Sequence, residues 1–246
     1  MQHRSKKIKK SFFIILVVLI VLSGGSAIYL SNYYHSVDVE KYMNGSWEVS
    51  VEKFDKGWFF DGAGEEKALI FYPGAKVATE AYAPLMDQLA ESGIDCFLVD
   101  MPFHMAFFGM NRAEEIMQEY NYEAWYLGGH SLGGAMAANF AADYVEDHTD
   151  GIRGLLLLAA YPTKDLSTSD MSVVTVYGSE DGVLNMDKIV AGRELMPQDY
   201  KEVCIEGGNH AQFGSYGAQK GDGTAAIPAE EQWARTVEVF VGDESE

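Results

Sequence analysis

Short apolar runs alternate with amphipathic stretches along most of this chain. Runs of strand length occur at residues 68–72, 96–99, 124–127, 155–160, 173–177 and 203–205. Stretches with helical spacing occur at residues 80–92, 113–120, 132–145, 186–195 and 230–241. Unbroken apolar strands that alternate with helices are typical of a mainly parallel sheet with helices on both faces. The pattern predicts an α/β fold, and alternation around Lys56-Gly57 predicts a β-hairpin at its start.

A different pattern occupies the N-terminus. Residues 1–10 contain five basic side chains and no acid, and residues 12–22 are all apolar. We expect a cytoplasmic basic tail at residues 1–10 and a signal anchor, a transmembrane helix, at residues 11–30, with the following chain outside the cell membrane. Small residues at 25–27 offer a cleavage site, so a secreted protein is the alternative.

The rest of the chain divides into a linker and one domain. Residues 31–45 are polar with scattered aromatic side chains and are expected to form a stalk. Residues 46–246 are expected to form the α/β domain, since about 200 residues suit one such domain better than two.

Charge and cysteine content exclude some classes of partner. The formal net charge is −19, and without the basic tail 13 Lys and Arg stand against 37 Asp and Glu. Such a domain repels nucleic acids and anionic headgroups. Cys96 and Cys204 each lie in an apolar run, so we expect both to be core thiols. A disulfide between them would require their two strands to be neighbours.

Candidate chemistry follows the ends of the predicted strands, where parallel sheets bind ligands. Between the strand at 124–127 and the next helix, Gly129-His-Ser131-Leu-Gly133 places a serine in a strand-to-helix turn. Such a turn strains the serine backbone and tolerates only small residues two positions before and after it. Ser131 is therefore the predicted nucleophile, exposed beyond the sheet and at a helix N-terminus.

A serine hydroxyl needs a base that is oriented by a carboxylate. Of the six histidines, His210 ends the glycine-rich loop after the last strand, and we predict that it is this base. His104 follows another strand and is expected in a pocket wall or in the core. The acid is expected after the strand at 173–177, where Asp181 is the choice and Glu180 the fallback. The chain order serine, aspartate, histidine is the one expected for α/β-hydrolases.

An acyl-transfer intermediate also needs two backbone donors for its negatively charged oxygen. We expect one from the N–H of Leu132, which follows the nucleophile. We expect the other from the turn after residues 68–72, with Ala75 as the first choice and Lys76 as the second.

The surroundings of the predicted site leave little room for a cover. Between the strand at 155–160 and the acid strand only residues 163–171 are available, so no large cap domain is expected. Residues 101–110 are rich in apolar side chains. Met101, Phe103 and Phe107 are therefore candidates to bind an acyl group, although aromatic side chains in such a run serve equally well as core.

Four blocks resemble a bacterial branch of the α/β-hydrolase superfamily. They lie at residues 72–77, 129–134, 177–182 and 206–214, and the branch carries Tyr-Pro-Gly-Gly-Lys-Val, Gly-His-Ser-Leu-Gly-Gly, Tyr-Gly-Ser-x-Asp-Gly and Glu-Gly-Gly-Asn-His-Ala-Gln-Phe-Gly there. This chain differs at Ala75, where the branch usually has glycine. The resemblance spans about residues 67–241 and implies the α/β-hydrolase fold with esterase-like activity.

These features together predict a serine hydrolase outside the cytoplasm. The favoured activity is that of a carboxylesterase on short or exposed acyl esters, with a small-molecule or cell-envelope ester as substrate. The alternatives are acyl transfer to, or deacylation of, envelope glycans or lipids, and a surface-binding protein without activity. The sequence contains no metal-ligand spacing and no phosphate-binding loop, so we expect no cofactor.

Overall fold

The computed structural model describes residue 25, residues 31–148 and residues 151–243. The chain separates into two units at residues 33 and 34, and the sheet lies in the second unit. The basic tail and the signal anchor expected at residues 1–30 lie outside the described residues, apart from Gly25. Across the described part of the chain, no helix is both long and apolar enough to cross a membrane.

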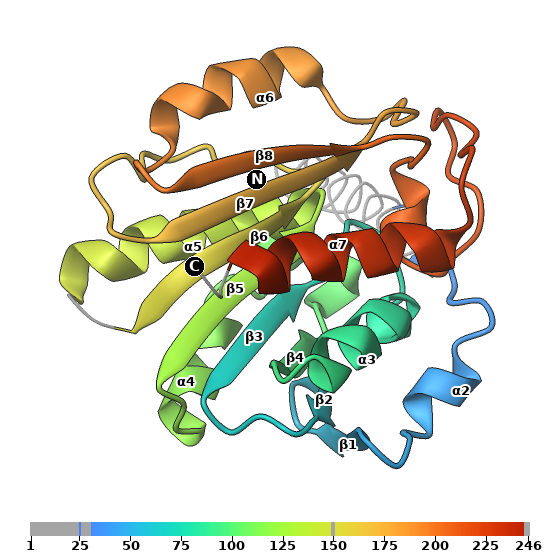
Figure 1. Ribbon diagram of the computed structural model, residues 1–246, viewed down its shortest axis with the longest axis horizontal. Coiled ribbons are helices and arrows are strands. Elements are labelled where there is room, and N and C mark those ends of the chain that lie inside the picture. Colours follow the sequence, from blue (N-terminus) through green and yellow to red (C-terminus); the bar gives the residue numbers. More distant parts are fainter. Residues whose placement is uncertain (1–24, 26–30, 149–150, 244–246) are drawn as a thin grey trace, which may run out of the picture. The chain divides into compact units, whose positions relative to one another are not determined.

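A mainly parallel sheet forms the centre of the second unit (Figure 1). Among the described residues it has eight strands in the order β1-β2-β4-β3-β5-β6-β7-β8. The β1–β2 hairpin is antiparallel, β2 pairs antiparallel with β4, and the remaining pairs are parallel, as predicted. The bounds are β1 (Ser50–Phe54), β2 (Gly57–Asp61), β3 (Lys67–Tyr72), β4 (Asp95–Val99), β5 (Ala124–His130), β6 (Ile152–Leu158), β7 (Ser172–Gly178) and β8 (Tyr200–Ile205).

Helices cover both faces of this sheet (Figure 1). Side chains alternate along β3, so Leu69 and Phe71 pack with α3 and α7, whereas Ile70 and Tyr72 pack with α4 and α5. The α-helices are α2 (Glu40–Met43), α3 (Ala83–Glu91), α4 (Arg112–Glu119), α5 (Leu132–Asp147), α6 (Met186–Gly192) and α7 (Ala229–Asp243). Short 3₁₀ helices are η1 (Thr79–Tyr82), η2 (Pro102–His104), η3 (Ala106–Phe108), η4 (Arg193–Leu195) and η5 (Ala211–Phe213).

Two of the predicted helices are broken near an end. The stretch at 80–92 begins as η1 and continues as α3, with Pro84 in the first turn of α3. Proline has no N–H to donate and a fixed φ, so it suits the start of a helix and not its interior. The stretch at 186–195 is α6 followed by η4, which tightens the last turn.

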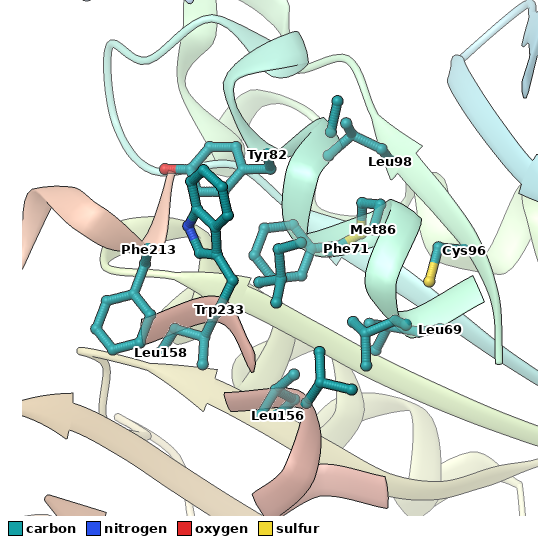
Figure 2. Close-up of a cluster of buried hydrophobic side chains, with 14 of the residues drawn as sticks. Leu69, Phe71, Tyr82, Met86, Cys96, Leu98, Leu156, Leu158, Phe213 and Trp233 are labelled. Atoms are coloured by element: carbon teal, nitrogen blue, oxygen red, sulfur yellow. The ribbon is translucent and has the colours of Figure 1, made fainter. Parts of the chain in front are cut away.

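The larger core lies between the sheet and the α3 and α7 face, and Figure 2 shows part of it. Leu69, Phe71, Met86 and Leu98 are fully buried there, and the free thiol of Cys96 lies beside them. The prediction of a core thiol is wrong for Cys204, which is exposed. Cys204 lies on β8, the last strand of the sheet order, where only one side has a neighbouring strand.

The segment expected to be a stalk packs on the domain from Tyr34 onward. The Tyr34 N–H donates to the carbonyl of Lys76 at 2.7 Å, and the Ala78 N–H donates to the carbonyl of Tyr34 at 2.8 Å. A little further along, Val39 is buried in the larger core. The local sequence could not show that Tyr34 packs on the domain, because its hydrogen-bond partners Lys76 and Ala78 lie more than 35 residues away.

The connection from β6 to β7 is short. Residues 159–171, all described, contain no helix and no strand. This connection therefore contains no large cap domain, as expected.

Candidate active site

Ser131 lies in the predicted turn between β5 and α5. Its backbone has φ 53° and ψ −120°, a strained combination for a residue with a side chain. The Ser131 N–H donates to the carbonyl of Leu158 at 2.8 Å, which helps to hold the turn against β6. The side chain is half-buried, so it is accessible from the strand ends.

Glycine is required on both sides of this serine, and the reason extends beyond the turn itself. A Cβ at Gly133 would lie 2.1 Å from the carbonyl oxygen of Tyr72, at the end of β3. A Cβ at Gly129 would lie 2.6 Å from the backbone of Gly133. The two glycines therefore let the start of α5 approach the end of β3, as well as letting the chain turn.

His210 and Asp181 form a buried pair beside this turn. The His210 Nδ1 and the Asp181 Oδ2 are 2.8 Å apart, and both side chains are 2% exposed. The other carboxylate oxygen of Asp181 accepts the N–H groups of Val183 and Leu184, each at 2.8 Å. Since a carboxylate accepts, Nδ1 carries the proton and Nε2 is left as the basic nitrogen. The fallback acid Glu180 is exposed and makes no contact with His210.

The His210 ring lies against the residue that precedes the nucleophile. Its centroid is 4.4 Å from the centroid of the His130 ring. Within the described residues, no hydrogen bond joins the Ser131 hydroxyl to His210. Catalytic hydrogen bonds are often long before substrate binds, so the lack of this bond leaves Ser131 and His210 as candidates for nucleophile and base.

The backbone N–H groups predicted to bind the oxyanion differ in whether they already have an acceptor. The strands β3 and β5 are adjacent, so the turn that holds Ala75 lies beside the start of α5 at Leu132. The N–H groups of Ala75 and Leu132 have no acceptor among the described residues. The Lys76 N–H instead donates to the carbonyl of His104 at 2.7 Å, which removes the second choice.

A buried tyrosine links the two halves of this predicted oxyanion site. The Tyr82 hydroxyl accepts the N–H of Gly74 at 3.0 Å and is hydrogen-bonded to the Nδ1 of His130, 2.7 Å away. A Cβ at Gly74 would come within 2.8 Å of both atoms, which explains the glycine. The loop after β3 is thus hydrogen-bonded through one side chain to the residue before Ser131.

Burial determines the protonation states of His130 and Tyr82. The pKa of His130 is held well below its usual value, because the ring is buried and lies near His210. Burial also raises the pKa of Tyr82, so its hydroxyl keeps its proton. The His130 Nε2 has no partner among the described atoms. A neutral His130 leaves His210 free to become the cation in this site.

The residues proposed for substrate binding are placed differently from one another. Met101 is 6% exposed, and its sulfur packs against Gly109, so it belongs to the core. Phe103 and Phe107 are 59% and 49% exposed. Phe108, which was not among the candidates, is 53% exposed and contacts Phe107, with 4.2 Å between ring centroids and the rings tilted by 45°.

Two residues near the pair carry no sequence motif. Tyr82 lies in a stretch with helical spacing, where a large aromatic side chain indicates core. Asp222 lies in the loop before α7, and its carboxylate accepts the backbone N–H groups of Gly182, His210 and Ala211. Only the flanking glycines at 221 and 223 indicate a tight turn there, and nothing local connects that turn to the site.

Among the described residues, no group of three His, Cys, Asp or Glu side chains gathers as metal ligands would. A surface hollow bordered by Glu123, Ile152 and Met171 lies at the amino ends of β5, β6 and β7, away from the Ser131 turn. A serine with a neighbouring buried histidine–aspartate pair supports covalent catalysis by acyl transfer.

Comparison with known proteins places residues 68–234 in a family model described as the alpha/beta hydrolase family. No curated protein matches the chain. Among solved structures, the chain is similar to Est1E from Butyrivibrio proteoclasticus, with a TM-score of 0.56 and 15% identity over 81% of this chain and 100% of that one.

Two further structures have a similar fold. The carboxyl esterase 2 of Tuber melanosporum has a TM-score of 0.59 and 12% identity over 85% of this chain and 89% of that one. The monoacylglycerol lipase of Paleococcus ferrophilus has a TM-score of 0.57 and 14% identity over 80% of this chain and 99% of that one. At such identities the similarity shows a shared fold and does not transfer a substrate.

Proposed function

The chain belongs to the alpha/beta hydrolase family, and we propose that it is a serine carboxylesterase with Ser131, His210 and Asp181 as its catalytic residues. One observation carries the proposal: a serine with a strained backbone at a helix N-terminus, next to a buried histidine that is hydrogen-bonded to an aspartate. Esterase relatives of the same fold add support for hydrolysis of an ester.

In the first half of the reaction the Ser131 hydroxyl attacks the ester carbonyl. The Nε2 of His210 takes the hydroxyl proton as the bond forms, and Asp181 stabilises the imidazolium through Nδ1. The carbonyl oxygen becomes an oxyanion, which in this proposal accepts hydrogen bonds from the N–H groups of Ala75 and Leu132. Collapse of this intermediate transfers the proton from His210 to the leaving alcohol and leaves an acyl group on Ser131.

In the second half water takes the place of the alcohol. His210 removes a proton from water, which attacks the acyl carbonyl, and the same two N–H groups bind the new oxyanion. The intermediate then releases the carboxylic acid and restores the Ser131 hydroxyl. Because the β6–β7 connection carries no cap, water and short or exposed esters reach the site directly.

We also propose that this reaction takes place outside the cytoplasm, on a membrane-anchored protein. The support is the sequence alone, a basic tail followed by an apolar run before the acidic domain. Cell fractionation tests it, with protease added to intact cells. Digestion of the domain in intact cells is expected, and full protection from protease would contradict the proposal.

A fluorophosphonate probe tests the catalytic proposal directly, since it labels only activated serines. The full chain is expected to react with the probe, and Ser131→Ala is expected to abolish both labelling and hydrolysis of p-nitrophenyl acetate, by at least about 10³-fold. Ser167→Ala is the matched control, because Ser167 is exposed on the β6–β7 connection. An unlabelled wild type, or equal labelling of the Ser131→Ala variant, would sink the proposal.

A further inference from the structure

The loop before α7 presents one carboxylate to both catalytic loops. Asp222 Oδ1 accepts the N–H of Gly182 at 3.1 Å and the N–H of His210 at 3.2 Å. Asp222 Oδ2 accepts the N–H of Ala211 at 2.8 Å. Gly182 directly follows the acid Asp181, whereas His210 and Ala211 belong to the loop of the base. One side chain therefore bonds to the backbone on both sides of the Asp181–His210 pair.

The backbone around this carboxylate is shaped to bring the loops together. A Cβ at Gly182 would lie 2.6 Å from the carbonyl oxygen of Gly221. A Cβ at Gly223 would lie 2.0 Å from the carbonyl oxygen of Glu180. The glycines on both loops thus allow a backbone approach that any other residue would prevent, and Asp222 lies in the middle of that contact.

The charge of Asp222 is balanced by backbone groups. Its hydrogen bonds come from N–H donors, including that of Gly223 at 2.9 Å, and no basic side chain pairs with it among the described residues. An ionised carboxylate that accepts several N–H bonds is strongly oriented. Asp181, His130, Tyr82 and Tyr216 are ionisable side chains close to the Asp181–His210 pair, and none of these four supplies a positive charge that would screen Asp222 from His210.

We propose that Asp222 is a positioning residue for the catalytic pair. By joining the acid loop at Gly182 to the base loop at His210 and Ala211, it fixes the distance and angle of the Asp181–His210 hydrogen bond. Its negative charge also favours the imidazolium that forms during acyl transfer. This role rests on the proposed function, because it acts only through His210.

The experiment compares Asp222→Ala and Asp222→Asn in the full chain. Active sites are first counted with the fluorophosphonate probe, and p-nitrophenyl acetate hydrolysis is then expressed per titrated site across a pH series. We expect kcat per site to fall about 10- to 100-fold in Asp222→Ala and by a smaller factor in Asp222→Asn, with little change in KM. The acid limb of kcat/KM is expected to move to lower pH, because a negative charge near His210 is lost.

Asp165→Asn is the matched control. Asp165 is an exposed carboxylate that also accepts a backbone N–H, from Ser167 at 2.9 Å, on the β6–β7 connection. It is expected to leave kcat per site and the acid limb unchanged. Asn keeps the size of Asp and one acceptor oxygen, so Asp222→Asn decides the question if Asp222→Ala lowers the yield of folded protein.

The outcomes separate the two proposals. If the wild type cannot be titrated with the probe, the proposed function fails. If the wild type is active but the Asp222 variants keep its kcat per titrated site and its acid limb, the positioning role is overturned. A reduced number of active sites with unchanged kcat per site would overturn it equally, since that result means a purely structural role.

Discussion

The strained backbone of Ser131 is maintained by the residues around it. The hydrogen bond from its N–H to Leu158 and the absence of side chains at Gly129 and Gly133 hold it between β3 and β6. Strain of this kind costs about 1–3 kcal/mol and persists only where the surroundings fix it. The residues that hold Ser131 in this conformation are thus its backbone neighbours, and none of them is among the proposed catalytic side chains.

Tyr82 is the residue whose role is tested most simply. Tyr82→Phe would leave the Gly74 N–H and the His130 Nδ1 without their partner in a buried place, at a cost of about 1–3 kcal/mol of unfolding free energy. Because the same loop carries Ala75, kcat for p-nitrophenyl acetate is expected to fall roughly tenfold, which corresponds to about 1.4 kcal/mol of lost transition-state binding.

Tyr216→Phe provides the comparison for this substitution. The Tyr216 hydroxyl also makes a side-chain hydrogen bond, to Gln219 at 3.0 Å, but it does not contact the loop after β3. We expect this variant to keep the wild-type kcat. Equal kcat values for the two tyrosine variants, measured per active site, would contradict a role for Tyr82 in the oxyanion site.

At the scale of elements, hydrogen bonds fix the segment after β4 beside the loop after β3, which carries Ala75. Phe103 and His104 both have positive φ, 57° and 55°, and the carbonyl of His104 accepts the Lys76 N–H. At the other end of the segment, the Tyr72 hydroxyl donates to the carbonyl of Met110 at 2.6 Å. The exposed phenylalanines are therefore presented from a fixed backbone, next to the site where an acyl group would bind.

This arrangement predicts that activity on longer acyl chains, unlike activity on acetate, depends on η3. Phe107→Ser is expected to lower kcat/KM for p-nitrophenyl octanoate about tenfold and to leave p-nitrophenyl acetate within about twofold, because a phenylalanine contact contributes about 1–2 kcal/mol. Trp47→Ser removes an even more exposed aromatic ring, 90% accessible and ahead of β1, and serves as the control. Parallel losses on both esters would mean that Phe107 does not bind the acyl chain.

The helix α3 carries a carboxyl group that weakens the fold at neutral pH. Burial, with a smaller effect of Glu91, raises the pKa of Asp87 from 3.8 to about 6. The folded state therefore binds this proton more tightly than the unfolded state, and stability falls as pH rises from about 4 to about 6. At pH 7 the charged form costs up to about 3 kcal/mol.

Asp87→Asn is therefore expected to raise the free energy of unfolding at pH 7 and to change it little at pH 4. Urea denaturation at the two pH values measures the difference, with the exposed Asp170→Asn as a variant that should have little effect at either pH. A gain of the same size at pH 4 and pH 7 would show that the ionisation of Asp87 is not the cause.

At the scale of the whole molecule, the features that could be predicted from the sequence are those that depend on residues close together along the chain. The parallel sheet could be predicted because unbroken apolar runs alternate with helical stretches, and parallel strands bring the carboxyl ends of those runs to one edge. Ser131, Asp181 and His210 were predicted as site residues in the same way, since each follows its own strand. The choice of Asp181 over Glu180 is supported by the contact with His210.

What could not be predicted depends on contacts between distant segments. Tyr82 contacts His130, 48 positions away, and Asp222 accepts from Gly182, 40 positions away, and no local pattern records those partners. The exposure of Cys204 follows from the position of β8 at the sheet edge, which is a property of the strand order and not of the strand. Met101 resembles its exposed neighbours in sequence and differs from them only in packing.

Because Tyr34 pairs with Lys76 and Ala78, a force on the N-terminal side of the domain acts first on the loop after β3. Tyr34, the first residue of the folded unit, is hydrogen-bonded to Lys76, the residue after Ala75. It therefore contacts the loop that is expected to bind the oxyanion. Tension applied to the chain ahead of Tyr34 therefore reaches that loop before it reaches the core. When the protein is immobilised or fused to another domain, a long flexible linker before Tyr34 would preserve turnover. A short stretched linker would pull on the loop after β3 that carries Ala75.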